Sequence, residues 1–332
     1  MDWQSIMSLS IQQALGPSAV IYCLAAIGLN VHFGYTGLLN FGQAGFMAIA
    51  GYSMASIVST WGLSLWLGIV VGLLLTVVLA LMLGVPTLRL RADYLAIVTI
   101  AAAEIIRQTV GSVTLVDYFG GQDGLTGFND SFRALNPFEG KLGIPGLVTW
   151  GSYDFWVMTV GWTLVALSCV IVWLLMRSPW GRVLKSIRED EDAVRSLGKN
   201  VYAYKMQALV IGGLFGALAG FVTALRSAAI NPSFFATDIT FFAYTVLLIG
   251  GAARVLGPVV GAVIFWLLIS ALGLFFAQAT AGADPIIPTW IMTSTQASLM
   301  RFIFLGLGLM LLMIFRPQGI FGDRRELALD AR

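Results

Sequence analysis

Long apolar runs, separated by short polar links, limit what this chain can fold into. A helix needs about 20 mostly apolar residues to cross a bilayer, and runs of that order recur along the 332 residues. Hydrophobic residues make up 58% of the chain and charged residues only 11%, whereas soluble domains usually carry about 25% charged residues. The sequence therefore predicts an all-α, polytopic membrane protein in which residues 1–332 form a single transmembrane domain.

The predicted spans follow one another with short links between most of them. They cover residues 17–33, 34–52, 63–83, 94–110, 155–176, 206–225, 241–252, 256–276 and 299–315. This makes about nine transmembrane helices, and the range is about eight to ten because the short seventh span and the glycine-rich second span could be re-entrant. The N-terminus lacks the basic region of a cleaved signal peptide, which favours a retained first span.

The distribution of lysine and arginine predicts the orientation, because these residues collect in the short cytoplasmic loops of membrane proteins. If the charged residues 178–205 are cytoplasmic, alternation of the spans places the other basic links on the same side: Arg89, Arg91, Arg254, Arg324 and Arg325. The N-terminus is then outside and the C-terminus cytoplasmic. Residues 111–154, with turn signals such as FGGQDGLTG, form an ordered extracytoplasmic loop in this interpretation.

Residues 178–205 are the one long charged stretch, and we call them the charged segment. Ser178 followed by Pro179 predicts a helix N-terminus, and Gly198 predicts its end. Helical spacing puts one group of residues on an apolar side, namely Val183, Ile187, Val194 and Leu197, and makes two oppositely charged pairs, Arg188 with Asp192 and Glu191 with Arg195. Such a helix is either a solvated connector or a docking element for a partner.

Residues 34–52 interleave glycines with Asn40 and Gln43. So many glycines let backbones approach closely or break a helix at membrane depth, which is tolerated where the segment is buried in protein or lines a cavity. Both small-residue packing and a place on a solute path are open here. Asn30, at the end of the first span, is a further candidate for the path.

Glu104 and Arg107 lie three residues apart in the fourth predicted span. A charge near mid-membrane costs on the order of 3 kcal/mol even on the milder insertion scales. We therefore expect the two side chains to pair and to face the interior of the bundle. The pair is either a structural latch or, with Asn30, Asn40 and Gln43, part of the translocation pathway.

The residues that would make this chain an enzyme are missing from its sequence. His32 is the single histidine, and the two cysteines, Cys23 and Cys169, lie inside apolar runs without metal or disulfide spacing. No G-x-S-x-G nucleophile motif, no P-loop and no basic, aromatic patch for nucleic acid is present. We predict no catalytic residue, no metal site and no cofactor in this chain.

If this chain pumps a solute, its energy comes from an ion gradient or from another subunit, because the chain has no P-loop of its own. Ion-coupled transporters often carry carboxylates in several spans, and Glu104 is the clear intramembrane acid here. A permease driven by a separate ATPase needs a cytoplasmic element that receives its motion, and the charged segment is large enough. The sequence favours the second arrangement.

Blocks of sequence in a fixed order resemble a known family. They are GLNVHFGYTGLLNFGQAGFMAIAGY (28–52), LRLRADYLAIVTIAAAEIIR (88–107), GGQDGLTG (120–127), SPWGRVLKSIREDEDAVRSLGKNVYAYK (178–205) and LLIGGAARVLGPVVGAV (247–263). These blocks resemble the longer permease subunit of bacterial branched-chain amino acid ATP-binding-cassette (ABC) importers. The resemblance extends over residues 28–322, nearly the whole chain.

Within the charged segment, Asp192, Ala193 and Val194 followed by Gly198 resemble the Glu-Ala-Ala and glycine signature of ABC permeases. The triplet departs from the signature by Asp for Glu and Val for Ala, and the Ile-x-Leu-Pro that often follows is absent. The resemblance implies a cytoplasmic coupling helix that docks on the ATPase. The residues expected in that contact are Arg188, Glu189, Glu191, Asp192, Ala193, Val194 and Gly198.

The resemblance also implies the partners and the activity. We expect a heterodimer with a second permease subunit, two ATP-binding-cassette subunits that hold ATP and Mg²⁺, and an extracytoplasmic solute-binding protein that lands on residues 111–154, all at a bacterial inner membrane. The expected function is inward transport of leucine, isoleucine and valine by alternating access. The alternatives are the same machinery for urea or short amides, a stand-alone ion-coupled transporter, and a non-transporting scaffold.

Overall fold

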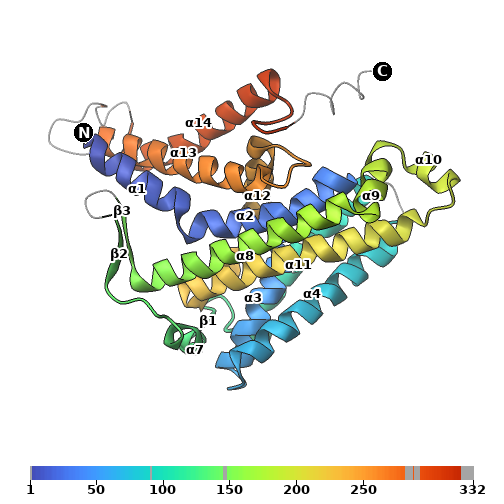
Figure 1. Cartoon of the computed structure of the whole chain (residues 1–332). Coiled ribbons are helices and arrows are strands. Elements are labelled where there is room, and N and C mark those ends of the chain that lie inside the picture. The colour runs from blue at the N-terminus through green and yellow to red at the C-terminus, as the bar shows by residue number, and fades with distance from the viewer. Residues whose placement is uncertain (1, 90–91, 145–147, 281–286, 288–291, 323–332) are drawn as a thin grey trace.

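In the computed structural model, which describes residues 2–89, 92–144, 148–280, 287 and 292–322, the chain is a bundle of long helices (Figure 1). Strands are confined to two small antiparallel pairs, β1 (Leu125–Thr126) with β4 (Ala229–Ile230) and β2 (Lys141–Ile144) with β3 (Val148–Gly151). The predicted all-α, polytopic membrane architecture is confirmed.

A helix overlaps each of the predicted spans, although the second, predicted at residues 34–52, begins only at Gln43. The helices are α2 (Pro17–Leu29) continued by the π-helix η1 (Asn30–Tyr35), α3 (Gln43–Ser59), α4 (Leu65–Thr87), α5 (Ala92–Val110), α8 (Ser152–Arg177), α11 (Val201–Ser227), α12 (Thr237–Gly250), α13 (Gly257–Thr280) and α14 (Ser294–Phe315). Within the described residues, six of these helices are long and apolar enough to cross a membrane. A seventh span results if α5 is joined to the short helices that follow it after a bend of 59°.

The two remaining helices are shorter. Helix α3 has 17 residues and α12 has 14. They occupy the second and seventh predicted positions, where the sequence left re-entrant segments open. The predicted count of about nine full spans therefore depends on two helices that are shorter than the usual crossing length of about 20 residues.

Helix α1 (Trp3–Leu15) was not predicted. It has 13 residues, and the Asp2 carboxylate caps it by accepting hydrogen bonds from the amides of Gln4 and Ser5 at 3.1 Å. It lies along α13 (Figure 1), where the Trp3 and Phe275 rings are 6.0 Å apart. Its shortness and its polar residues hid it from a search for membrane-length apolar runs.

Helices α2, α3 and α11 form the centre of the bundle. The membrane-length window of α2 and η1 is 89% buried, whereas that of α14 is 0% buried. Close approach of α2 and α11 requires glycine, because a Cβ atom on Gly28 would lie 2.4 Å from the carbonyl oxygen of Gly212. The outer helices expose large apolar side chains such as Leu74 and Ile303, as expected for helices that face lipid.

Residues 111–154 form an ordered cap at one end of the bundle, apart from residues 145–147, which lie outside the described part. The cap contains η2 (Val113–Leu115), α6 (Val116–Phe119), β1, α7 (Asp130–Ala134), β2 and β3. The Phe132 and Trp156 rings stack at 5.6 Å and attach α7 to α8. In Figure 1, α7, β2 and β3 lie at the opposite end of the bundle from α9 (Pro179–Glu189) and α10 (Glu191–Ser196).

After α14 the chain turns back and caps the C-terminal end of α12. The Ile320 amide donates to the Ile249 carbonyl at 3.0 Å, and the Phe321 amide donates to the Gly250 carbonyl at 3.1 Å. These bonds satisfy carbonyls that a helix end leaves without intrahelical donors. Arg91, Arg324 and Arg325, which were used to predict the orientation, lie outside the described residues.

Candidate functional site

The charged segment forms two helices rather than one. Ser178 is the N-cap of α9 with Pro179 at its first position, as predicted. Helix α9 ends at Glu189, and Asp190 takes an extended conformation and caps α10 by accepting the Ala193 amide at 2.9 Å. The break occurs because an aspartate that can act as an N-cap is followed by acidic residues, which favours a new helix start.

Helix α9 lies on its own chain. Leu184 and Ile187 are 0% and 4% exposed, and α9 packs against η1 and α11. Of the apolar residues expected on one side, Ile187 and Val194 are buried, Val183 is half-buried and Leu197 is 79% exposed. The prediction assumed a single helix, whereas the break at Asp190 places Leu197 at the C-terminal end of the separate helix α10.

The charged side chains around the break form a network. Arg195 donates to Glu191 at 2.8 Å, as predicted, and to Asp192 at 2.7 Å. Lys205, at the start of α11, also pairs with Glu191. The predicted pair of Arg188 with Asp192 spans two helices, and each of these residues has a different partner.

Arg188 connects α9 to the π-helix. Its Nη1 atom donates to the carbonyl oxygen of Gly34 at 2.5 Å, and its side chain lies against Gly37. A guanidinium bond to a carbonyl is charge-assisted and stronger than a neutral one. This bond therefore attaches α9 to η1.

The outer surface of the charged segment remains open. Glu189, Asp192, Ala193 and Gly198 are exposed. A cleft of about 580 Å³ lies beside them, lined by charges of both signs that include Arg89, Glu191, Asp192, Arg195 and Lys199. Of the residues expected to contact an ATPase, Val194 is buried and Glu191 and Arg188 are half-buried.

A break in the helix at residues 36–42 separates η1 from α3, and a buried polar network surrounds it. Asn40 accepts the Gly42 amide at 2.9 Å and donates through Nδ2 to His32 Nδ1 at 3.0 Å. Because the amide nitrogen is only a donor, His32 Nδ1 accepts and Nε2 carries the proton. His32 Nε2 then donates to the Leu209 carbonyl at 3.0 Å.

Side chains of other helices satisfy the backbone of this break. Thr99 of α5 accepts the Phe41 amide at 3.0 Å, and Tyr244 of α12 donates to the Asn40 carbonyl at 2.9 Å. Thr240 of α12 accepts the Ala44 amide at 3.0 Å. Irregular backbone at membrane depth is stable only where such partners or water are supplied, so α5 and α12 support the break.

Asn30 joins η1 to the turn between α12 and α13. Its Nδ2 donates to the Arg254 carbonyl at 2.8 Å, and its Oδ1 accepts the Ala253 amide at 2.8 Å. Glycine at position 34 leaves room for this contact, because a Cβ there would lie 2.1 Å from Asn30 Oδ1. Asn30, Asn40 and Gln43 are each at most 1% exposed, and their place on a solute path remains a prediction.

Glu104 and Arg107 form the predicted ion pair. Arg107 donates through Nε at 2.9 Å and through Nη2 at 2.6 Å to the two carboxylate oxygens. Their side chains are 42% and 24% exposed, so the expectation that they face the interior of this chain is wrong. A two-bond pair neutralises both charges, and it can therefore lie on the outer surface of the bundle.

Comparison with known proteins identifies the family. The family model described as "Branched-chain amino acid transport system / permease component" matches residues 16–314. The chain belongs to this permease family. The match includes the network around Asn40, the Glu104–Arg107 pair and the charged segment.

Individual relatives agree with this assignment. The permease is 30% identical over 318 residues to LivM, a high-affinity branched-chain amino acid transport system permease protein of Salmonella typhimurium, covering 91% of this chain and 68% of the relative. It is also 30% identical over 311 residues to LivM of Escherichia coli, with the same coverage. A nucleoside ABC transporter permease protein of Lactococcus lactis is 25% identical and covers 75% of each chain.

Two features of the permease were not selected as sites from the sequence. His32 was noted only as the single histidine. A histidine inside an apolar span needs hydrogen-bond partners for both ring nitrogens, and here they are Asn40 and the Leu209 carbonyl. A cavity that includes Tyr22, Asp154, Arg226 and Asp238 was missed because its residues come from distant parts of the chain. Within the described residues, no three His, Cys, Asp or Glu side chains gather as a metal site.

The Glu104–Arg107 pair gives a test of structural pairing in the permease. Glu104→Ala is expected to lower the yield of folded protein more than the double change with Arg107→Ala, because the single change leaves the guanidinium without its carboxylate. Fluorescence-detected size-exclusion chromatography of all four members of the double-mutant cycle measures this yield. Equal yields for the single and double variants would contradict the pairing.

Proposed function

We propose that this permease is the membrane subunit of an ABC importer that moves leucine, isoleucine and valine inward by alternating access. The observation that carries the proposal is the contact from the charged segment into the bundle, Arg188 Nη1 to the Gly34 carbonyl. The family match and the branched-chain amino acid transport of the LivM relatives support the choice of branched-chain amino acids. ATP and Mg²⁺ belong to partner subunits in this proposal.

The ATPase docks on the charged segment. The exposed residues around α10 and the cleft of about 580 Å³ beside it offer charges of both signs to a partner surface. Interfaces of this kind gain specificity and register from complementary charges. Buried Val194 supports the position of α10, and Glu189, Asp192, Ala193 and Gly198 form the contact.

Motion passes from the docking surface to the helix break through hydrogen bonds. Arg188 holds η1 at Gly34, and Asn30 of η1 holds the turn between α12 and α13. His32, also in η1, holds Asn40 in the break. A shift of α9 on nucleotide binding therefore acts on α12 and α3 together, and these helices rock about the break during alternating access.

The orientation follows from the same proposal. The charged segment is cytoplasmic, so the cap formed by residues 111–154 is extracytoplasmic and receives the solute-binding protein. The N-terminus is outside and the C-terminus inside a bacterial inner membrane. In this proposal the permease is half of a heterodimer. The exposed apolar side chains of its outer helices therefore face lipid on part of the surface and the second permease subunit on the rest.

Reconstitution tests the proposal. The complex of this permease with its partner permease, two ATPase subunits and the binding protein is expected to accumulate labelled leucine in vesicles only when ATP and Mg²⁺ are supplied on the ATPase side. Uptake by this chain alone on a proton or sodium gradient would instead establish an ion-coupled transporter. Uptake of urea or acetamide in preference to leucine, isoleucine and valine would overturn the cargo assignment.

A further inference from the structure

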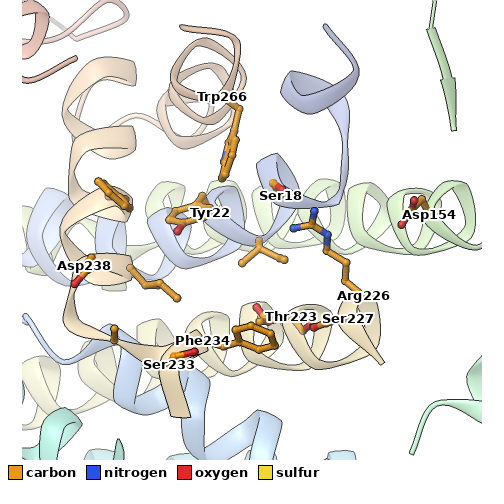
Figure 2. A pocket seen from close by; sticks show the side chains of 14 residues that line it. Ser18, Tyr22, Asp154, Thr223, Arg226, Ser227, Ser233, Phe234, Asp238 and Trp266 are labelled. Carbon is orange, nitrogen blue, oxygen red and sulfur yellow. The ribbon is translucent and has the colours of Figure 1, made fainter. Parts of the chain in front are cut away.

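A cavity of about 570 Å³ lies between α2, α11, α12 and α13 and the start of α8 (Figure 2). Its lining includes Asp154 at the start of α8 and Arg226 at the end of α11, and these are the ends of the two helices that lie beside the cap. Ligand pockets of small molecules usually have volumes of about 300–1,000 Å³. This cavity is therefore large enough for an amino acid together with a few water molecules.

Three charged side chains line the cavity, and they are Asp154, Arg226 and Asp238. Figure 2 shows Asp154 and Arg226 toward one end of the cavity and Asp238 toward the other. Within the described residues none of the three forms a salt bridge. A cation and an anion therefore line one end of the cavity without a charged partner, and both side chains are exposed to a ligand that enters it.

The wall between the two charged ends of the cavity is aromatic. Tyr22 lies 5.4 Å from Trp266 and 6.3 Å from Phe242, measured between ring centroids. All three rings line the cavity, and Figure 2 shows Tyr22 between Arg226 and Asp238. Aromatic faces bury apolar groups well and leave a polar edge toward water. This wall suits an aliphatic side chain of a few carbon atoms.

We infer that the cavity is a binding site for a zwitterionic α-amino acid with an apolar side chain. Arg226 binds the carboxylate, because a guanidinium presents paired donors that match carboxylate geometry. Asp154 binds the ammonium group, and the aromatic wall receives the side chain. The inference rests on the proposed function, since it places the transported solute within this subunit.

Two variants test the two charge contacts separately. Labelled leucine binding is measured on the purified transporter complex in lipid nanodiscs without the solute-binding protein, with isoamylamine and 4-methylpentanoate as competitors. Isoamylamine lacks the carboxylate and 4-methylpentanoate lacks the ammonium group. Arg226→Gln and Asp154→Asn are each expected to weaken leucine binding about tenfold to hundredfold, because each removes a hydrogen bond to a charged group.

The competitors separate recognition from general damage. The wild-type complex is expected to prefer leucine over both competitors. Arg226→Gln should remove the preference over isoamylamine alone, and Asp154→Asn should remove the preference over 4-methylpentanoate alone. Asp117→Asn, at an exposed residue of the cap outside the cavity, should leave both preferences unchanged.

The outcomes also distinguish this inference from the proposed function. Unchanged leucine binding and unchanged preferences in Arg226→Gln and Asp154→Asn would overturn the site. Absence of saturable leucine binding to a wild-type complex that still performs ATP-driven uptake would overturn the site and leave the proposed function intact. Saturable binding without any ATP-driven uptake would support the site and contradict the proposed function.

Discussion

Arg188→Ala is expected to lower ATP-driven uptake by at least about tenfold, because it removes a charge-assisted bond worth about 1.5–3 kcal/mol. The lost bond is the one that joins α9 to the Gly34 carbonyl of the π-helix. The ATPase subunits should continue to hydrolyse ATP, so the ratio of ATP hydrolysed to leucine transported should rise. Parallel assays of phosphate release and of leucine accumulation in the same proteoliposomes measure this ratio.

Arg182→Ala is the matched control for this experiment. Arg182 lies on the same helix, and its side chain is exposed. It should transport leucine at the wild-type rate. Normal coupling in Arg188→Ala, or an equal defect in Arg182→Ala, would contradict the role of the Arg188–Gly34 contact.

Asn40→Leu is expected to destabilise the permease by at least about 2–6 kcal/mol, because the two buried polar groups that bond Asn40 most closely lose their partner and each costs about 1–3 kcal/mol. These two groups are the Gly42 amide and His32 Nδ1, and the longer bond of 3.3 Å to Gln43 Oε1 is lost as well. Leucine has a similar shape, so the loss comes from hydrogen bonding more than from volume. The melting temperature of the purified complex and the yield of monodisperse protein measure the effect.

Ser53→Ala provides the comparison for Asn40→Leu. The Ser53 hydroxyl bonds to the Ile49 carbonyl of its own helix α3 at 2.5 Å. Removing that hydroxyl leaves no buried donor or acceptor unpaired, and we expect a change in melting temperature of no more than a degree or so. An equally small change in Asn40→Leu would show that the network around the break does not stabilise the fold.

The sequence was sufficient to locate the spans because membrane-length apolar runs follow from the thickness of the bilayer. Each predicted span has its helix, but the 17 residues of α3 and the 14 residues of α12 differ in length from a full crossing. Helix α1 was missed because it packs along α13 rather than reaching crossing length by itself. Its existence depends on tertiary contacts, which an apolar-run search does not detect.

In the charged segment, the capping and spacing of residues predicted some features correctly and missed the break between the two helices. Ser178 with Pro179 correctly marked the start of α9, and the Glu191–Arg195 pair formed as its spacing indicated. The same helical spacing carried the prediction across Asp190, where a capping bond begins a second helix instead. The prediction relied on periodicity alone at this residue, where the capping bond outweighs it.

The candidate sites depend on contacts between distant residues. Asn40 was selected from the sequence, but its partner His32 and the support from Thr99 and Tyr244 come from three different helices. The cavity at Arg226 was missed for the same reason, since Asp154 and Arg226 are brought together only by the packing of α8 and α11. The spacing of residues along one helix cannot predict contacts between residues of different helices.

The capped end of α12 has a practical consequence for handling this protein. Because Ile320 and Phe321 supply donors to the last turn of that helix, residues 316–322 are a structural part of the bundle. A stop codon at Gln318 would remove both donors while leaving every long helix in place. Affinity tags and fluorescent fusions should therefore be placed downstream of these residues and should not replace them.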